Sequence, residues 1–172
     1  MKEKFSILFT GISGSGKTTL AKRVSEKLEQ RNISTYILDG DEIRNEMGNL
    51  FGYTREERMK NNQVVRMLIK VLMKNRINTL VTLVAPYEEM REKMRDAIGD
   101  AYIEVYVDCP VEVCRIRDTK GYYKMAEKGN IENLNGTNDC YEVPANSDIV
   151  VHTDKESIEE SADKIVELLI NM

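Results

Sequence analysis

The sequence predicts an α/β fold in which a five-stranded, mostly parallel sheet is covered by helices on both faces. Three observations support this fold class. Short apolar runs alternate along the chain with segments whose apolar residues recur at helical spacing. The 172 residues are enough for one domain with a buried core, which we expect to span residues 1–172. The sequence also shows neither an internal repeat nor a low-complexity linker that would divide it.

Five short apolar segments are expected to form the strands. The first, FSILFTG at residues 5–11, is mainly apolar and ends in glycine, as is typical of a buried strand. It is too short for the apolar region of a signal peptide and leads directly into glycines, so we interpret it as a strand. The other four expected strands are STYILDG (34–40), INTLVTLVAP (77–86), AYIEVYVDCP (101–110) and SDIVVHT (147–153).

Helical periodicity marks the segments between these strands. In residues 17–30 apolar side chains recur every three or four positions. The same spacing predicts a helix at 62–75, and a charged helix is expected around 88–98. A capping box formed by Thr153 and Glu156 is expected to start the last helix, which runs through SIEESADKIVELLI (157–170).

A polar stretch at residues 118–146 contains glycines and one proline and has no strong periodicity. It is too long for an ordinary connection within a compact domain. Such a segment is usually a functional lid or a disordered loop. We expect a lid at this position.

Composition limits the classes of partner and the cellular compartment. The chain is 41% hydrophobic and 31% charged, and its net charge of −4 argues against a nucleic-acid partner. No segment approaches the length of a membrane span, so no membrane association is expected. The three cysteines are an odd number without a CxxC pair, which favours a reducing, cytoplasmic setting.

The segment GISGSGKT at residues 11–18 matches the phosphate-binding pattern G-x-x-x-x-G-K-[ST], after an expected strand and at the start of an expected helix. Its glycines let backbone N–H groups surround phosphate oxygens, and the helix N-terminus adds partial positive charge. Lys17 is placed to reach the β- and γ-phosphates, and Thr18 to hold Mg²⁺. The predicted ATP-binding residues of this segment are Gly11, Ser13, Gly14, Ser15, Gly16, Lys17, Thr18 and Thr19. The alternative is a flexible glycine turn before a helix.

The choice between ATP and GTP rests on motifs elsewhere in the chain. The guanine-binding motif N-K-x-D is absent from the sequence. DAIG at residues 96–99 fits the D-x-x-G pattern of GTPases, but it lies at the end of an expected helix and not after a strand. These observations favour an ATP-using small-molecule kinase.

The segment LDGDEIR at residues 38–44 leaves the end of the second expected strand. Ligands of open α/β sheets bind at the carboxyl ends of the strands, so this loop is expected to face the phosphates. Of Asp39 and Asp41, one carboxylate could accept a proton from an attacking hydroxyl, while Arg44 could hold an anionic part of the acceptor. The alternative is an Asp-Gly turn with solvated charges.

Taken together, these segments resemble the adenylyl-sulfate (APS) kinases, which transfer the γ-phosphate of ATP to the ribose 3′-hydroxyl of adenylyl sulfate. The resemblance covers nearly the whole chain and implies a P-loop kinase fold, Mg²⁺ as cofactor, a small nucleotide as acceptor and a possible homodimer. The D-G-D-x-x-R element and the block YVDCPVEVC…RDTKGYYK at 106–124 are more specific to the family than the phosphate-binding pattern. The segments that carry the resemblance are GISGSGKTTL, LDGDEIR, GYTREERMKNN, LVAPYEEMR, IEVYVDCPVEVCRIRDTKGYYKMAEKGNI and NGTNDCYEVP.

The resemblance also implies roles for single residues. Asp41 resembles the residue that takes the proton of the acceptor hydroxyl, and Asp39 the companion carboxylate near the magnesium ion. Tyr53 stands where the family usually has a phenylalanine against the acceptor base. Arg117 and Lys120 are similar to lid residues near ATP. The further acceptor-binding residues implied by the match are Arg44, Arg58, Asn61, Val84, Ala85 and Leu134.

The sequence departs from the family pattern in the acceptor half. The family usually has S-P-Y-R where this chain has APYE, with Ala85 and Glu88, and K-x-F-T-G where it has ENLNG, with Glu132 and Leu134. After D-G-D-x-x-R it has NEM in place of H-G-L. These changes predict altered acceptor specificity, and the alternative is compensated drift. We therefore expect adenylyl sulfate as acceptor, with cytidine diphosphoramidate in capsule biosynthesis as the alternative and a catalytically silent nucleotide-binding module as a third possibility.

Overall fold

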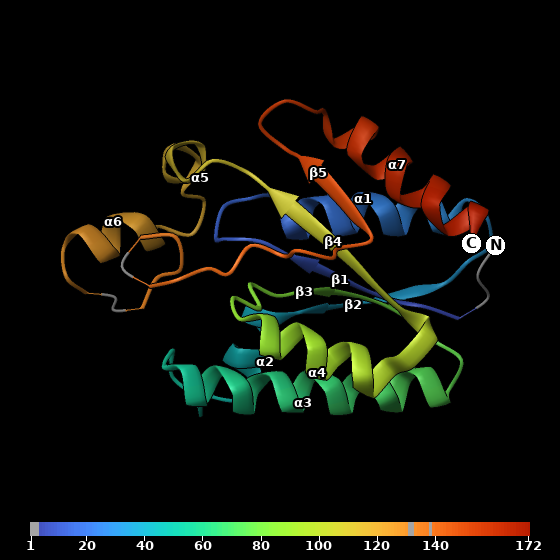
Figure 1. Cartoon of the computed structure of the whole chain (residues 1–172), viewed down its shortest axis with the longest axis horizontal. Helices are drawn as coiled ribbons and strands as arrows, with labels where there is room; N and C mark the ends of the chain where they lie inside the picture. Colours follow the sequence, from blue (N-terminus) through green and yellow to red (C-terminus); the bar gives the residue numbers. More distant parts are fainter. Residues whose placement is uncertain (1–3, 131–132, 138) are drawn as a thin grey trace.

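A parallel β-sheet lies at the centre of the molecule (Figure 1). The computed structural model describes residues 4–130, 133–137 and 139–172. Within them the strands are β1 (Ser6–Thr10), β2 (Thr35–Asp39), β3 (Asn78–Thr82), β4 (Tyr102–Asp108) and β5 (Ile149–His152). Their order is β2-β3-β1-β4-β5, and every neighbouring pair is parallel. The expected five-stranded sheet is confirmed, and it is parallel throughout.

Helices cover both faces of this sheet (Figure 1). On one face lie α1 (Lys17–Glu29) and α7 (Ile158–Asn171). On the other lie α2 (Gly40–Glu46), α3 (Arg55–Lys74) and α4 (Glu88–Ile98), followed by the short 3₁₀ helix η1 (Gly99–Ala101). The central strand β1 is buried along its whole length, as expected for a strand covered on both faces.

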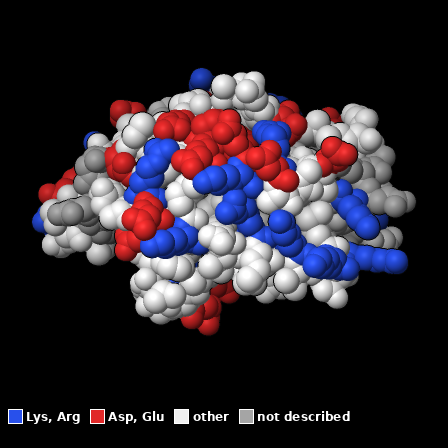
Figure 2. Space-filling model, turned by 60° about the horizontal axis from the view of Figure 1, so that its bottom comes forward, with Lys and Arg blue, Asp and Glu red and all other residues white. Residues whose placement is uncertain are grey.

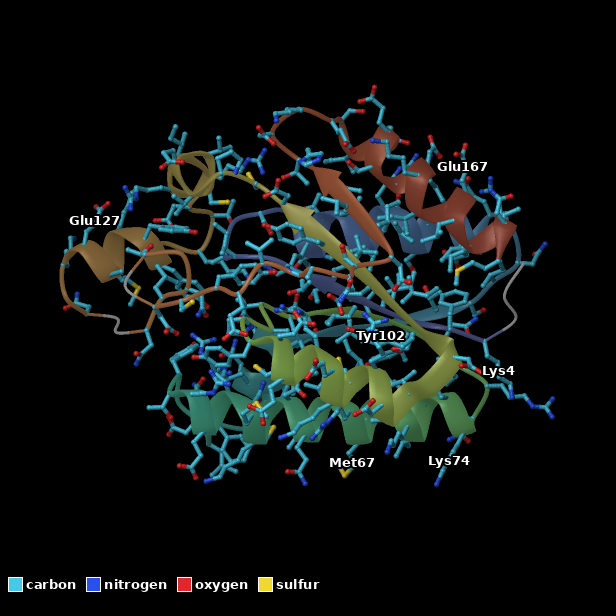
Figure 3. The ribbon with its side chains drawn as sticks, in the orientation of Figure 1. Lys4, Met67, Lys74, Tyr102, Glu127 and Glu167 are labelled. Atoms are coloured by element: carbon cyan, nitrogen blue, oxygen red, sulfur yellow. The ribbon has the colours of Figure 1, made fainter. Side chains whose placement is uncertain are left out.

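Alternate residues of the strands supply two separate apolar cores. Ile7 of β1 packs in the core beneath α1 and α7, whereas its neighbour Leu8 packs in the core beneath α3 and α4. At the start of β4, Tyr102 points between the sheet and α4 (Figure 3). Met67 and Lys74 of α3 point away from the sheet in the same view. Both cores hold the carboxyl ends of the strands at one edge of the molecule.

Two helix starts differ from the prediction. Helix α3, which was predicted at 62–75, begins at Arg55, because Thr54 and Glu57 form a capping box ahead of the apolar positions. The last helix begins at Ile158, capped by Ser157, whose Oγ accepts from the Glu160 N–H at 3.2 Å. The predicted box of Thr153 and Glu156 was wrong, since two S/T-x-x-E frames follow one another here and the second one adjoins the helix.

The segment expected to be a lid projects beyond the carboxyl edge of the sheet (Figure 1). It is preceded by α5 (Val111–Arg117) and contains α6 (Tyr122–Glu127). Its buried residues Tyr123 and Leu134 form a small apolar cluster with Cys114 of α5. The Tyr123 hydroxyl donates to the Ser13 carbonyl oxygen at 2.7 Å, so the lid helix contacts the phosphate-binding segment directly.

The surface carries both signs of charge. On the face turned forward in Figure 2, acidic side chains gather in the upper part and basic side chains form a band below them. Among the residues that the structure describes, no helix is both long enough and apolar enough to cross a bilayer.

Candidate active site

The phosphate-binding loop connects β1 to α1. Gly14 has φ 78° and Gly16 has φ 98°, backbone conformations that disfavour side chains. A Cβ on Gly14 would also lie 2.9 Å from the Cys114 carbonyl oxygen of α5. Glycine is therefore required here for two reasons: the backbone has positive φ, and α5 leaves no room for a side chain at Gly14.

Lys17 lies over this loop. Its Nζ donates to the carbonyl oxygens of Gly11 and Ile12, each at 2.8 Å. Burial lowers the pKa of this ammonium from 10.5 to about 8, although Asp41 nearby opposes the shift. In the described part of the chain its recorded hydrogen bonds are to carbonyls and not to a carboxylate. Such a partly desolvated cation is well suited to bind a phosphate oxygen.

Asp39 ends β2 and connects three elements. Its Oδ2 accepts hydrogen bonds from the hydroxyls of Thr18 at 2.7 Å and Thr82 at 2.8 Å, while Oδ1 caps α2 by accepting from the Asp41 N–H at 3.0 Å. Burial alone would raise the pKa of this carboxyl, but the three hydrogen bonds outweigh burial and lower it. Asp39 is therefore ionised next to the phosphate-binding loop.

The oxygens of Thr18 and Asp39 fit a magnesium site. Mg²⁺ in phosphoryl-transfer enzymes is usually held by one or two protein oxygens together with waters and substrate phosphates. Thr18 and Asp39 supply two such oxygens, which lie within hydrogen-bond distance of each other. Thr82 was not predicted; its place at the carboxyl end of β3 is the signal that could have identified it.

Asp41 lies in the first turn of α2, with its side chain partly exposed. A Cβ on Gly40 before it would lie 2.2 Å from Leu83 Cδ2 and 3.1 Å from the Thr82 carbonyl oxygen, so a larger residue would require Leu83 to shift. The Asp41 carboxylate forms an ion pair with Lys120, which lies between α5 and α6. Burial alone would lower the pKa of Lys120, but the bond to Asp41 outweighs burial and raises it. The lid thus reaches the predicted catalytic base, whereas the predicted contact of Lys120 with ATP stays a prediction.

One cavity of about 460 Å³ joins the phosphate-binding loop to the expected acceptor region. The predicted site residues that line it are Ser13, Gly14, Gly16, Lys17, Thr18, Thr19, Asp39, Asp41, Arg44, Tyr53, Arg58, Asn61, Val84, Ala85, Arg117, Lys120 and Leu134. Gly11 and Ser15 are not among the lining residues. A Cβ on Gly11 would lie 2.5 Å from the Val107 carbonyl oxygen, so this glycine serves the packing of the loop against β4.

We name Arg44, Tyr53, Arg58, Ala85 and Leu134 the acceptor wall. The guanidinium carbons of Arg44 and Arg58 lie 4.6 and 5.2 Å from the centre of the Tyr53 ring. The sequence predicts that both arginines bind the acceptor. Both are buried, and their recorded hydrogen bonds, in the part of the chain that is described, go to backbone carbonyls.

These carbonyls belong to neighbouring segments of the site. Arg44 Nη1 donates to the Gly52 oxygen at 2.9 Å. Arg58 Nε donates to the Tyr53 oxygen at 2.8 Å, and its Nη2 to the Asn133 oxygen of the lid at 2.7 Å. The arginines therefore hold the wall in place, whatever they bind besides.

Glu88 corrects one sequence interpretation. Its negative charge was expected to alter the acceptor site, but Glu88 does not line the cavity and forms an ion pair with Arg91. Arg91 is fully buried and donates to the Ala85 oxygen at 2.7 Å and the Glu142 oxygen at 2.8 Å. The negative charge of Glu88 is thus balanced by Arg91 outside the cavity lining. Glu132, the other reversed charge, lies outside the described residues.

The cavity also has lining residues that sequence reasoning missed. Thr153, Ser157 and Ile158 lie near the start of α7, beyond the phosphate-binding loop. Asn62 lines the other side, adjacent in sequence to the predicted Asn61. The spacing of apolar residues in α3 did not predict that Asn62 faces inward, because Asn62 lies in the polar run Lys60–Gln63.

A phosphate-binding loop at the end of β1, a lysine over it and two carboxylates at the end of β2 define a P-loop phosphotransferase. The family model described as adenylylsulphate kinase matches residues 3–152. The chain belongs to the adenylyl-sulfate kinase family, and it is an ATP-dependent kinase that phosphorylates an alcohol group.

Relatives and solved structures agree with this assignment. The adenylyl-sulfate kinase of Halothermothrix orenii is 43% identical over 164 residues, which cover 95% of this chain and 88% of that protein. That of Clostridium kluyveri is 40% identical over 163 residues, covering 95% and 82%. The Mycobacterium tuberculosis APS kinase, solved in complex with AMPPNP and APS, has a TM-score of 0.92 at 32% identity and covers 99% of both chains.

Proposed function

We propose that this chain transfers the γ-phosphoryl group of ATP to the ribose 3′-hydroxyl of adenylyl sulfate, giving 3′-phosphoadenylyl sulfate and ADP. The observation that carries the proposal is that one cavity contains Lys17, Asp41 and the acceptor wall. A solved relative that covers 99% of this chain binds an ATP analogue and adenylyl sulfate, which supports the same pair of substrates here.

Asp41 is the proposed general base. As the 3′-oxygen bonds to the γ-phosphorus, its proton passes to the carboxylate of Asp41, and the bond between the γ-phosphorus and the β,γ-bridging oxygen breaks. Lys17 donates to the phosphates and neutralises charge that develops on the transferred group. Lys120 must leave Asp41 before the base can act, and the phosphates provide a stronger anionic partner for its ammonium.

Thr18 and Asp39 are the residues that would hold Mg²⁺. Bound there, the ion would neutralise charge on the β- and γ-phosphates. The ionised state of Asp39, maintained by three hydrogen bonds, is what this role requires.

Replacing Asp41 tests the proposed chemistry. We expect Asp41→Asn to keep ATP binding and to lower kcat by at least about a hundredfold, the usual size of a general-base effect. Glu42→Gln is the matched control, because Glu42 is the exposed neighbour on the same helix. Near-normal turnover of Asp41→Asn would contradict the role of Asp41.

The acceptor is tested by comparing kcat/KM for adenylyl sulfate and for cytidine diphosphoramidate. We expect adenylyl sulfate to be the better substrate. A higher value for the cytidine compound would assign the acceptor wall to a pyrimidine. A silent nucleotide-binding module would consume no ATP with either compound.

A further inference from the structure

The side chain of Asn62 is buried without hydrogen-bond partners. It is 1% exposed, and neither its Oδ1 nor its Nδ2 has a partner among the residues that the structure describes. Buried amides are almost always hydrogen-bonded, and an unsatisfied one destabilises the fold. An amide that leaves both a donor and an acceptor unsatisfied therefore requires an explanation.

Asn62 lies where a substrate can supply the missing partners. It projects from α3 one turn after Arg58 and lines the same cavity as the acceptor wall. The same lining includes Leu83 and Met90, whose side chains offer no strong hydrogen-bonding group. The amide is thus a buried polar group at the cavity wall, and a small number of such groups commonly fix the orientation of a ligand in a mainly apolar site.

The chemistry of the amide selects which part of the acceptor it contacts. Phosphate and sulfate oxygens are acceptors, so they would satisfy Nδ2 and leave Oδ1 unpaired. A base that has an amino group beside a ring nitrogen offers a donor and an acceptor together. Adenine presents this pair, and the amide of asparagine matches it with two hydrogen bonds.

We propose that Asn62 is a specificity-determining residue whose amide hydrogen-bonds the amino group and an adjacent ring nitrogen of the acceptor base. This inference rests on the proposed function, because it requires an amino-purine acceptor in the cavity. Asn62 would then select the base of the acceptor, whereas Asp41 and Lys17 would act in phosphoryl transfer to its ribose hydroxyl.

The test compares two acceptors and two forms of the enzyme. The acceptors are adenylyl sulfate and its purine analogue that lacks the 6-amino group, and the forms are the wild type and Asn62→Leu. We expect the wild type to prefer adenylyl sulfate by about tenfold to a hundredfold in kcat/KM, the range for one or two hydrogen bonds. In Asn62→Leu the preference should fall to about threefold or less, through a higher KM for adenylyl sulfate with an unchanged KM for ATP.

Stability separates this role from a structural one. Removing an unpaired buried amide should leave the Tm of the ligand-free protein unchanged or higher, whereas loss of a structural contact would lower it. Gln63→Leu, on the exposed side of the same helix, is the matched control and should change neither Tm nor preference. If Asn62→Leu folds poorly, Asn62→Ala gives the same readout, since a ratio of two kcat/KM values does not depend on the folded fraction.

Each outcome decides the inference. A wild-type preference that persists in both Asn62 variants overturns it, as does a lower Tm with equal losses for both acceptors. Failure of the wild type to phosphorylate adenylyl sulfate overturns the proposed function and this inference together. Turnover by the wild type without an effect of Asn62 overturns this inference alone.

Discussion

The phosphate-binding loop is one continuous stretch of chain, whereas the acceptor wall is assembled from separate segments. Ser13, Gly14, Gly16, Lys17 and Thr18 all line the cavity from this one stretch. The wall brings together α2, the chain before α3, α3 itself, the loop after β3 and the lid. Buried arginines hold these segments by donating to backbone carbonyls.

Because of this difference, the role of a charged residue is easier to predict from the sequence in the loop than in the acceptor wall. In the loop, spacing along the chain fixes the position of Lys17 relative to the glycines, so its role follows from the pattern. In the wall, Arg44 and Arg58 contact carbonyls that only the folded chain brings to them. A charge near the cavity can therefore bind substrate, support the wall or do both.

The largest expected effect is in the loop. Lys17→Met should lower kcat by about a thousandfold, because it removes a preorganised positive charge from the transferred phosphoryl group. Steady-state kinetics with adenylyl sulfate measures the change. Lys22→Met, an exposed lysine of α1, is the control. Comparable losses in the two variants would show that Lys17 does not act through the phosphates.

The next effect concerns the support of the wall. Arg91→Met should lower the free energy of unfolding by roughly 3 kcal/mol, the lower end of the range for breaking a buried pair, because Glu88 loses its partner while buried Glu104 keeps Arg95. Denaturant unfolding measures this. Exposed Lys70→Met should change stability by no more than about 0.5 kcal/mol. An Arg91→Met protein as stable as the wild type would mean that the wall does not depend on this arginine.

Lys120 tests whether the lid acts with the loop or with the wall. The ion pair with Asp41 is partly exposed to solvent, so Lys120→Ala should change the free energy of unfolding by less than about 1 kcal/mol. Loss of a charge-assisted contact to phosphate should raise KM for ATP by about tenfold. A faster enzyme with an unchanged KM would instead identify Lys120 as an inhibitory partner of Asp41.

The smallest effect is on pH dependence. Because the pKa of Lys17 is lowered to about 8, the folded protein binds fewer protons at this residue than the unfolded chain between about pH 8 and 10.5. Its contribution to the free energy of unfolding therefore rises with pH across that window. ATP binding needs the ammonium, so the Kd for ATP should rise about fivefold between pH 8 and pH 9. Calorimetric titration measures this, and Lys17→Arg should show a flat profile.

Much of the fold follows from the sequence because it depends on local patterns. The order of strands and helices and the phosphate-binding loop are encoded in periodicity and in the spacing of glycines. The start of α3 was missed because its first turns carry polar residues that point inward at the cavity. Periodicity of apolar residues gives no signal for Arg58 and Asn62, which are buried all the same.

The candidate site is predictable only in part. The resemblance located Asp41, Tyr53 and Leu134 on the cavity, since these positions belong to family motifs. It also led to the wrong expectation for Glu88, whose partner Arg91 lies behind the wall. Where a side chain points depends on tertiary packing, which a motif read along the chain does not contain.

The hydrogen bond from Tyr123 to Ser13 links two motions that a kinase must perform. Separating α6 from the nucleotide site breaks this bond and exposes a ring that is now 1% accessible to solvent. We therefore expect a movement of α6 away from Ser13 to loosen the backbone of the phosphate-binding loop, so that opening of the lid and release of ADP would be coupled.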